Sequence, residues 1–145
     1  MSDTVSIFRY SHRVTYAECT VGNHVYHARY LDLLEAARGE FFRGLGFPLM
    51  SLQEHDAVFP VIECQLQYKA PARYDDHLEI YVWITELAGV RLDFSYRILN
   101  QVEQLLVEGT TRHACSGTAG KPKRLPKDLI EALRPHLRIV EKQPQ

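Results

Sequence analysis

The stretch YHARYLDLLEAARGEFFRGLGFP, residues 26–48, decides the fold because it holds the one long helical pattern of the chain. Apolar residues recur in it at three- and four-residue steps, the spacing that lines one face of an α-helix. The glycines and the proline of residues 44–48 are typical of a helix end. We therefore expect one amphipathic helix from His27 to about Gly44, with a buried stripe of Tyr30, Leu33, Leu34, Ala37, Phe41, Phe42 and Leu45.

Strand patterns fill most of the remaining chain. Residues 6–16 alternate loosely and predict a first strand before the helix. After a polar loop, four segments carry apolar residues at every second position, and turn sequences at 70–76, 87–90 and 100–104 separate them. This pattern predicts an antiparallel meander with one buried face. The side chains expected on that face are Ile62, Cys64, Leu66, Tyr68, Leu78, Ile80, Val82, Ile84, Val90, Leu92, Phe94, Tyr96, Ile98, Leu105, Val107, Thr111, His113 and Cys115.

A single long helix has to cover the apolar face of this sheet, so we expect an α+β fold in which the sheet wraps around the helix. A chain of 145 residues is long enough to bury a core without metals or disulfides, and it predicts one domain over residues 1–145. The core is expected at about 8–116. A basic loop and a short helix are expected at 117–137, with Leu129 and Leu133 inward.

Composition excludes several classes of partner. The formal net charge is −1, which gives no reason to expect nucleic acid or an anionic membrane surface. No apolar run approaches the roughly 20 residues that span a bilayer, and the first ten residues do not resemble a signal peptide. The three cysteines are far apart and form no CxxC pair. They predict reduced thiols in the cytoplasm, with neither a disulfide framework nor a metal site.

Just before the helix, the stretch TYAECTVGNHVYHARY (15–30) crowds reactive side chains around one glycine. It resembles the 4-hydroxybenzoyl-CoA thioesterase and YbgC-like branch of the hotdog-fold acyl-CoA thioesterases. In that branch a tyrosine, two residues and Asp-Thr-Asp-Ala-Gly-Gly-Val-Val-Tyr-His-Ala-x-Tyr lead into the central helix. Residues 26–30 match the end of that motif, and residues 68–84 resemble the following strand-turn-strand. The resemblance covers about residues 8–116.

The resemblance implies a hotdog fold, a curved antiparallel sheet around one central helix, and hydrolysis of an acyl-CoA or acyl carrier protein thioester. It implies no cofactor beyond the coenzyme A of the substrate, and an assembly into a homodimer or homotetramer. The family's tyrosine and histidine fall on Tyr16 and His27. Its catalytic aspartate falls on Thr20, whose hydroxyl is a poor nucleophile without a base beside it.

Several side chains are candidates to activate or orient the attacking water. Glu18 is a candidate general base, the alternative being a solvated charge at a strand end. Thr20 and Asn23 together are candidates to hold a water without taking its proton. His24 and His27 stand three residues apart, and His27 is expected to contact the thioester carbonyl or Tyr16.

Other side chains suggest alternative chemistries for the site, each with weaker support from the sequence. Glu35 is a second candidate base, although its spacing also predicts an ion pair with Arg38. A Cys19–His24 nucleophile pair and a metal site from His24, His27 and His113 lack any diagnostic spacing. Cys64 and Cys115 are expected in the core.

Binding groups are expected from the backbone and from basic residues. The N–H groups of Val25, Tyr26 and His27 near the helix start are candidates for an oxyanion hole, unless Asn23 caps them. The candidate cations for coenzyme A phosphates are Arg73, Lys121, Lys123 and Arg124, with Lys69 and Lys127 nearby in sequence.

Two other functions are compatible with the same fold. An accessory protein that binds acyl thioesters without turnover would keep the pocket and lose the base. A hotdog hydratase or dehydratase is disfavoured, because neither a D-x-N-P-x-H nor an H-F-P-x-x-P run is present.

Overall fold

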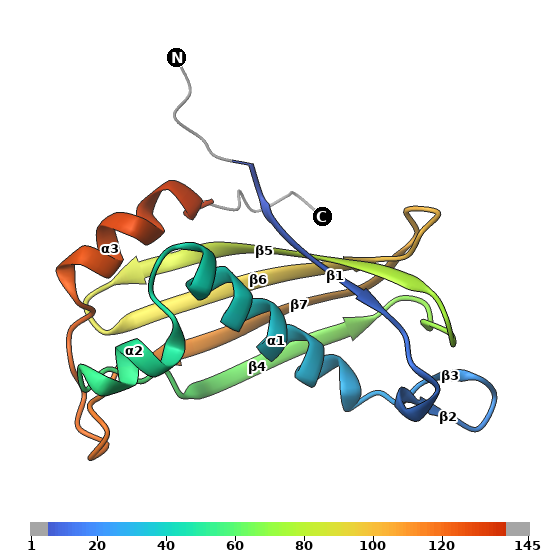
Figure 1. Ribbon diagram of the computed structural model, residues 1–145, viewed down its shortest axis with the longest axis horizontal. Coiled ribbons are helices and arrows are strands. Elements are labelled where there is room, and N and C mark those ends of the chain that lie inside the picture. Colours follow the sequence, from blue (N-terminus) through green and yellow to red (C-terminus); the bar gives the residue numbers. More distant parts are fainter. Residues whose placement is uncertain (1–5, 139–145) are drawn as a thin grey trace, which may run out of the picture.

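A five-stranded antiparallel sheet curves around one long helix, α1 (Arg29–Gly44), in the computed structural model, which describes residues 6–138 (Figure 1). The predicted α+β plan is therefore confirmed. Residues 1–5 and 139–145 of the expected domain lie outside the described residues. The strands of the sheet are β1 (Phe8–Arg13), β4 (Val61–Tyr68), β5 (His77–Ala88), β6 (Arg91–Leu99) and β7 (Leu105–Ala114).

The predicted helical stripe is the centre of the core. Six of its residues, Tyr30, Leu33, Leu34, Ala37, Phe41 and Phe42, are buried, and Leu45 is half-buried. They pack on the inner side chains of β5, β6 and β7, among them Ile80, Phe94 and Ile98. The helix stops after Gly44, and Gly46 takes the left-handed backbone conformation (φ +88°) that glycine adopts without strain.

The strand order differs from the expected meander. Only β5, β6 and β7 follow one another in space, and the full order is β1-β5-β6-β7-β4. The strand β4 therefore pairs with β7 at one edge instead of preceding β5 as a neighbour. The side chains of β4 are mostly exposed. Cys64 is exposed, so its predicted place in the core is wrong, whereas Cys115 is buried as predicted.

Several short elements were not predicted. A 3₁₀ turn, η1 (Tyr16–Glu18), leads into a two-stranded hairpin of β2 (Cys19–Thr20) and β3 (His24–Val25). The hairpin lies at the end of the molecule beside the start of α1 (Figure 1). A helix, α2 (Leu49–Glu54), replaces part of the expected polar loop.

The C-terminal part agrees with the sequence pattern. Helix α3 (Lys127–Leu133) buries Leu129 and Leu133, and a 3₁₀ turn, η2 (Arg134–His136), follows it. Helix α3 covers the end of the sheet opposite to the β2–β3 hairpin (Figure 1). Within residues 6–138, no helix is both long and apolar enough to cross a membrane.

Candidate active site

The β2–β3 hairpin sets the geometry of the site. Its turn is closed by Gly22 (φ +90°) and Asn23 (φ +58°), residue types that tolerate the left-handed region. The turn makes Thr20 the direct cross-strand partner of His24. Side chains of such a pair share one face of the hairpin, with their Cβ atoms about 5 Å apart. A Cβ at Gly22 would lie 3.3 Å from Cδ2 of His24, so the imidazole rests on the bare glycine.

A cavity of about 480 Å³ opens between this hairpin, the start of α1 and the end of β4. We call it the hairpin cavity. Its walls are largely aromatic, and the Tyr68 hydroxyl donates a hydrogen bond to the His27 carbonyl (3.1 Å) across its floor. An apolar enclosure with a few polar groups is the usual form of a small-molecule site. The lining residues are Thr20, His24, Val25, Tyr26, His27, Tyr30, Tyr68, Lys69, Ala70 and Pro71.

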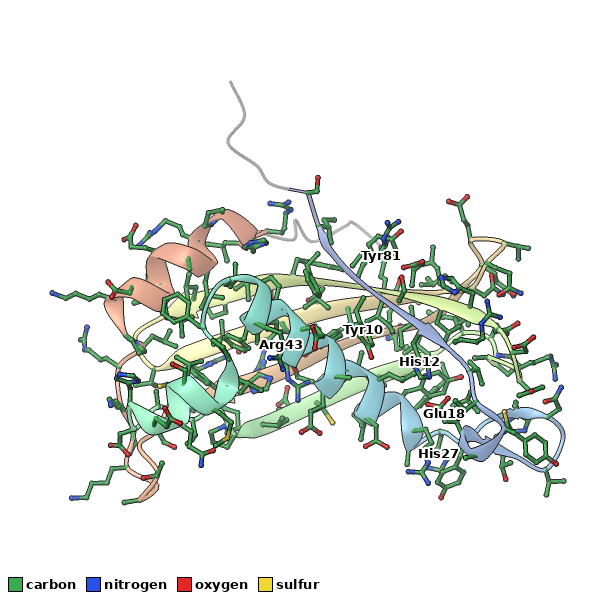
Figure 2. All side chains as sticks on the ribbon, viewed as in Figure 1. Tyr10, His12, Glu18, His27, Arg43 and Tyr81 are labelled. Carbon is green, nitrogen blue, oxygen red and sulfur yellow. The ribbon has the colours of Figure 1, made fainter. Side chains whose placement is uncertain are left out.

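Three of the six predicted catalytic residues meet in this cavity: Thr20, His24 and His27. Neither the Thr20 hydroxyl nor the His24 imidazole has a hydrogen-bond partner within residues 6–138. The His27 ring contacts the Tyr26 ring with centroids 4.5 Å apart and planes tilted by 51°, and it stands beside the start of α1 (Figure 2). The cavity thus presents a hydroxyl and two imidazoles that are free to bind a substrate or a water.

Glu18 is held away from the cavity. His12 Nε2 lies 2.8 Å from Oε1 of Glu18, and the two side chains point toward one another beside the hairpin (Figure 2). The same oxygen accepts hydrogen bonds from the backbone N–H (2.7 Å) and the hydroxyl (3.0 Å) of Thr15. Burial alone raises the pKa of Glu18, but the bonds from Thr15 and His12 outweigh it and hold the pKa below its usual value. Glu18 therefore caps the η1 turn, and its predicted role as base is not supported.

Tyr16 and Asn23 also lie outside the cavity lining. Tyr16 is 79% exposed and packs edge-on against Tyr74. The Asn23 side-chain oxygen accepts the backbone N–H of Tyr74 (3.3 Å). Asn23 therefore fastens the hairpin to the loop before β5, and the catalytic roles predicted for Tyr16 and Asn23 stay predictions.

Fewer backbone N–H groups are free to form an oxyanion hole than the sequence predicted. The Val25 N–H donates to Ala72 O (2.9 Å) and the Tyr26 N–H donates to Glu18 O (3.0 Å), so both are occupied. The helix itself starts at Arg29, after all three predicted donors, and Ala28 is its N-cap. Only the His27 N–H of the three has no acceptor within residues 6–138.

Comparison with known proteins identifies the family of this chain. The sequence profile of the thioesterase-like superfamily matches residues 14–133. The chain belongs to the thioesterase-like superfamily.

Individual relatives agree with this family. The chain is 37% identical over 126 residues to the acyl-CoA thioester hydrolase YbgC of Escherichia coli O6:H1, covering 86% of this chain and 94% of the relative. A solved structure from Thermus thermophilus, of a hypothetical protein, is 34% identical with a TM-score of 0.83 and covers 88% of this chain and 98% of its own. A probable thioesterase from Bartonella henselae is also 34% identical, with a TM-score of 0.79 and coverage of 83% and 100%. The expected hotdog fold is thereby confirmed.

The cations predicted to bind coenzyme A phosphates lie at two different ends of the sheet. Arg73 donates to the carbonyls of Gly22 (3.5 Å) and Asn23 (3.4 Å), so it holds the hairpin turn. Lys121, Lys123 and Arg124 follow β7 and lie at the opposite end of the sheet, where Lys123 Nζ donates to the His55 carbonyl (3.2 Å). Lys69, a secondary candidate from sequence, is the cation that lines the hairpin cavity.

The competing interpretations receive no support from the geometry. The Cys19 thiol donates to Thr15 O (3.6 Å), and burial raises its pKa, so it is not an activated nucleophile for His24. Glu35 and Arg38 form no ion pair, and Arg38 donates to the Tyr96 hydroxyl (3.0 Å). The described residues contain no group of three His, Cys, Asp or Glu side chains placed to hold a metal ion.

A second hollow, about 430 Å³ in volume, lies on the outer face of the sheet around Trp83. Its charged residues, Arg97 and Glu108, pair with each other at 3.7 Å. Because its charges are already compensated, this hollow is a weaker candidate for chemistry than the hairpin cavity.

Proposed function

We propose that this protein hydrolyses acyl-CoA thioesters to a free acid and a thiol. The observation that carries the proposal is the Thr20–His24 pair, which faces the hairpin cavity with both polar groups unpartnered. Membership of the thioesterase-like superfamily and the 37% identity to an acyl-CoA thioester hydrolase support the same chemistry. An acyl carrier protein thioester has the same reactive bond and remains a second substrate form.

The groups of the cavity suggest a simple sequence of steps. The Thr20 hydroxyl orients a water, and the His24 imidazole takes its proton as the water attacks the thioester carbonyl carbon. Imidazole suits this role because it titrates near neutral pH. The His27 N–H donates to the oxygen that becomes negative. The carbon–sulfur bond then breaks, and the protonated His24 returns its proton to the leaving thiolate.

Other lining residues would bind rather than react. Tyr26, Tyr30 and Tyr68 present aromatic surface to the acyl group, and Lys69 offers a charge to a phosphate of coenzyme A. The family aspartate has no counterpart at Thr20, so His24 takes over the proton transfer in this proposal.

We further propose that the working form is a homodimer joined through β4. This strand has no partner on its outer edge within residues 6–138, and an unpaired edge invites pairing with another strand. Antiparallel pairing of two β4 strands around a two-fold axis brings the hairpin cavity of one copy toward the Lys121–Arg124 loop of the other. The predicted phosphate-binding cations would then serve the second copy's site. Two such dimers meeting through the outer sheet faces would give the expected homotetramer.

A reducing compartment such as the cytoplasm suits this proposal. All three cysteines are free thiols, and Cys64 is exposed. An exposed thiol persists where disulfides are kept reduced.

Thiol release from a panel of short-chain, long-chain and aromatic acyl-CoAs tests the proposed activity. Because the exposed Cys64 would itself react with a thiol reagent, the enzyme is used as the Cys64→Ser variant. We expect turnover of at least one class that saturates with substrate. Binding of every acyl-CoA without any release of thiol would overturn the proposal and favour the accessory-protein alternative.

A further inference from the structure

A smaller cavity, of about 200 Å³, lies farther along α1 and is not part of the hairpin cavity. We call it the Arg38 cavity. Apolar side chains from α1, α2 and the segment before β4 form most of its wall, among them Phe42, Leu49 and Phe59. Its polar lining includes Arg38, Glu35 and the buried His113.

The polar groups behind this cavity form a continuous, linear chain of hydrogen bonds. His113 Nδ1 lies 2.9 Å from the Phe59 carbonyl, which only accepts, so this nitrogen carries the proton. His113 Nε2 then accepts from the Thr111 hydroxyl (2.8 Å), which accepts from Tyr96 (2.6 Å). The Tyr96 hydroxyl in turn accepts from Arg38 (3.0 Å). His113, Thr111 and Tyr96 are therefore saturated and neutral.

Arg38 is the exception in this chain. Its guanidinium carries five N–H donors, and the bond to Tyr96 uses one of them. No carboxylate within residues 6–138 lies within 4 Å of it, although Glu35 stands three residues earlier. A half-buried guanidinium against an apolar wall is costly unless its donors are satisfied. The remaining donors are therefore available to an oxygen acceptor from a ligand.

The position of the cavity indicates which ligand group that is. Tyr30 lines the hairpin cavity and Arg38 lines the second one, and the eight residues between them span about 12 Å of helix. The strand β4 ends beside the first cavity at Tyr68 and is preceded by Phe59 in the second. The first cavity thus borders the end of β4 and the second borders the segment before that strand, both beside α1, so an acyl group held by its thioester in the first cavity can extend along α1 toward the second.

We propose that the Arg38 cavity receives the far end of the acyl group and selects acyl groups that carry a hydrogen-bond-accepting oxygen there. This inference rests on the proposed thioester hydrolysis. A terminal carboxylate is the best acceptor, because guanidinium–carboxylate bonds are charge-assisted and bidentate. A terminal hydroxyl satisfies fewer donors. A plain alkyl end satisfies none and leaves the guanidinium desolvated.

Kinetics with matched substrates test the selection. The substrates are octanoyl- and dodecanoyl-CoA with a methyl, hydroxyl or carboxyl group at the ω-position. We expect the wild type to favour the ω-carboxyl over the alkyl substrate of the same length by about ten- to hundred-fold in kcat/KM, the range of one or two charged hydrogen bonds. The ω-hydroxyl substrate should fall between them. Alkyl substrates turned over as well as both oxygenated forms would overturn the proposal.

Variants separate recognition from folding. Arg38→Met should abolish the preference for an oxygenated end over an alkyl end, and Arg38→Lys should keep part of it. Glu35→Gln should increase the preference for the carboxyl end, since it removes the one negative charge that lines the cavity. Arg43→Met, on the exposed side of the same helix, is the matched control and should change nothing. A preference that survives in Arg38→Met would also overturn the proposal.

A binding measurement distinguishes this inference from the proposed activity. Thioether analogues of the same acyl-CoAs cannot be hydrolysed, and their affinities are measured by calorimetry. Tighter binding of the ω-carboxyl analogue that depends on Arg38, without turnover of any thioester, would sustain the selection and reject the hydrolysis. Turnover without any dependence of affinity or rate on Arg38 would do the reverse.

Discussion

Thr20 and His24 are cross-strand partners in the short β2–β3 hairpin. Neither side chain has a hydrogen-bond partner within residues 6–138, which distinguishes both of them from Glu18 beside them. Glu18 is the nearest carboxylate in sequence, yet His12 and Thr15 already occupy its oxygens. A carboxylate held in this way has a lowered pKa, which makes it a weaker base. The chemistry of the site therefore depends on the hydroxyl and the imidazole.

Substitution at Thr20 should move the rate in both directions. Thr20→Val removes the group that orients the water, and we expect kcat to fall about ten-fold, the value of one neutral hydrogen bond. Thr20→Asp places a carboxylate in the cavity, where a base contributes about 10²–10⁴-fold, so kcat should rise. Steady-state thiol release measures both changes, with Thr85→Val on the outer sheet face as the control. An aspartate variant that folds and binds without gaining rate would argue against this place for Thr20.

Glu18 should matter for stability more than for proton transfer. Glu18→Gln weakens the capping of η1, and we expect a loss of about 1 kcal/mol in the free energy of unfolding at neutral pH. Because the folded-state pKa of Glu18 is lowered, its contribution is full above the ordinary carboxyl pKa and is lost as the pH falls through the folded value. Urea unfolding of wild type and variant should therefore converge in acid. The exposed Glu54→Gln serves as control, and a difference that stays constant with pH would contradict this role.

At the scale of the elements, local patterns were sufficient for α1 and for the course of each long strand. The three- and four-residue steps gave the buried stripe from Tyr30 to Phe42, and the alternation gave the inward residues of β5 and β6. The pairing of β4 with β7 was missed, because strand order depends on contacts that are distant in sequence. The capping role of Glu18 was also missed, although the three-residue spacing from Thr15 to Glu18 is the local sequence pattern of a capping box.

The sequence predicted which segment holds the site, but it did not predict which side chains of that segment line the cavity. Sequence gave Thr20, His24 and His27 together with Tyr16, Glu18 and Asn23, and it did not separate the two sets. Gly22 and Asn23 are typical of a tight turn, and this signal alone could have predicted the hairpin that pairs Thr20 with His24.

The exposed edge of β4 should join two copies of the chain. Ile62 on this strand is 57% exposed, and a lysine there places a charge in the proposed interface. We expect the wild type to sediment as a dimer or a larger even assembly, and Ile62→Lys to shift toward monomer with lower activity. Val102→Lys, in an exposed turn away from this edge, should leave both properties unchanged. A wild-type protein that is monomeric at micromolar concentration would contradict the proposed interface.

At the scale of the whole molecule, one buried polar chain ties α1 to the sheet and to the segment before β4. Arg38 comes from the helix, Tyr96 from β6 and Thr111 with His113 from β7, and the chain ends on the Phe59 carbonyl. Burial lowers the pKa of His113 to about 4; the bond to Phe59 opposes this shift, Arg38 adds to it and Asp93 opposes it. The fold therefore holds this histidine neutral.

A neutral buried histidine makes global stability depend on pH. The unfolded chain binds a proton at His113 near pH 6.5 and the folded chain only near pH 4, so stability is full above the first value and is lost as the pH falls toward the second. The loss approaches about 3 kcal/mol at its limit. Urea unfolding between these pH values should show this slope in the wild type and a flatter one in His113→Asn. The same slope in both proteins would contradict it, and the exposed His55→Gln should keep the wild-type slope.

The proton transfer assigned to His24 is the central claim, and the pH dependence of kcat in wild type and His24→Gln tests it most directly. We expect wild-type kcat to rise with pH as the catalytic base loses its proton and then to level off. His24→Gln should lower kcat by about 10²–10⁴-fold, with little change in KM, and should remove that inflection. A variant that keeps the wild-type rate and the wild-type pH profile would contradict the assignment of His24 as the base.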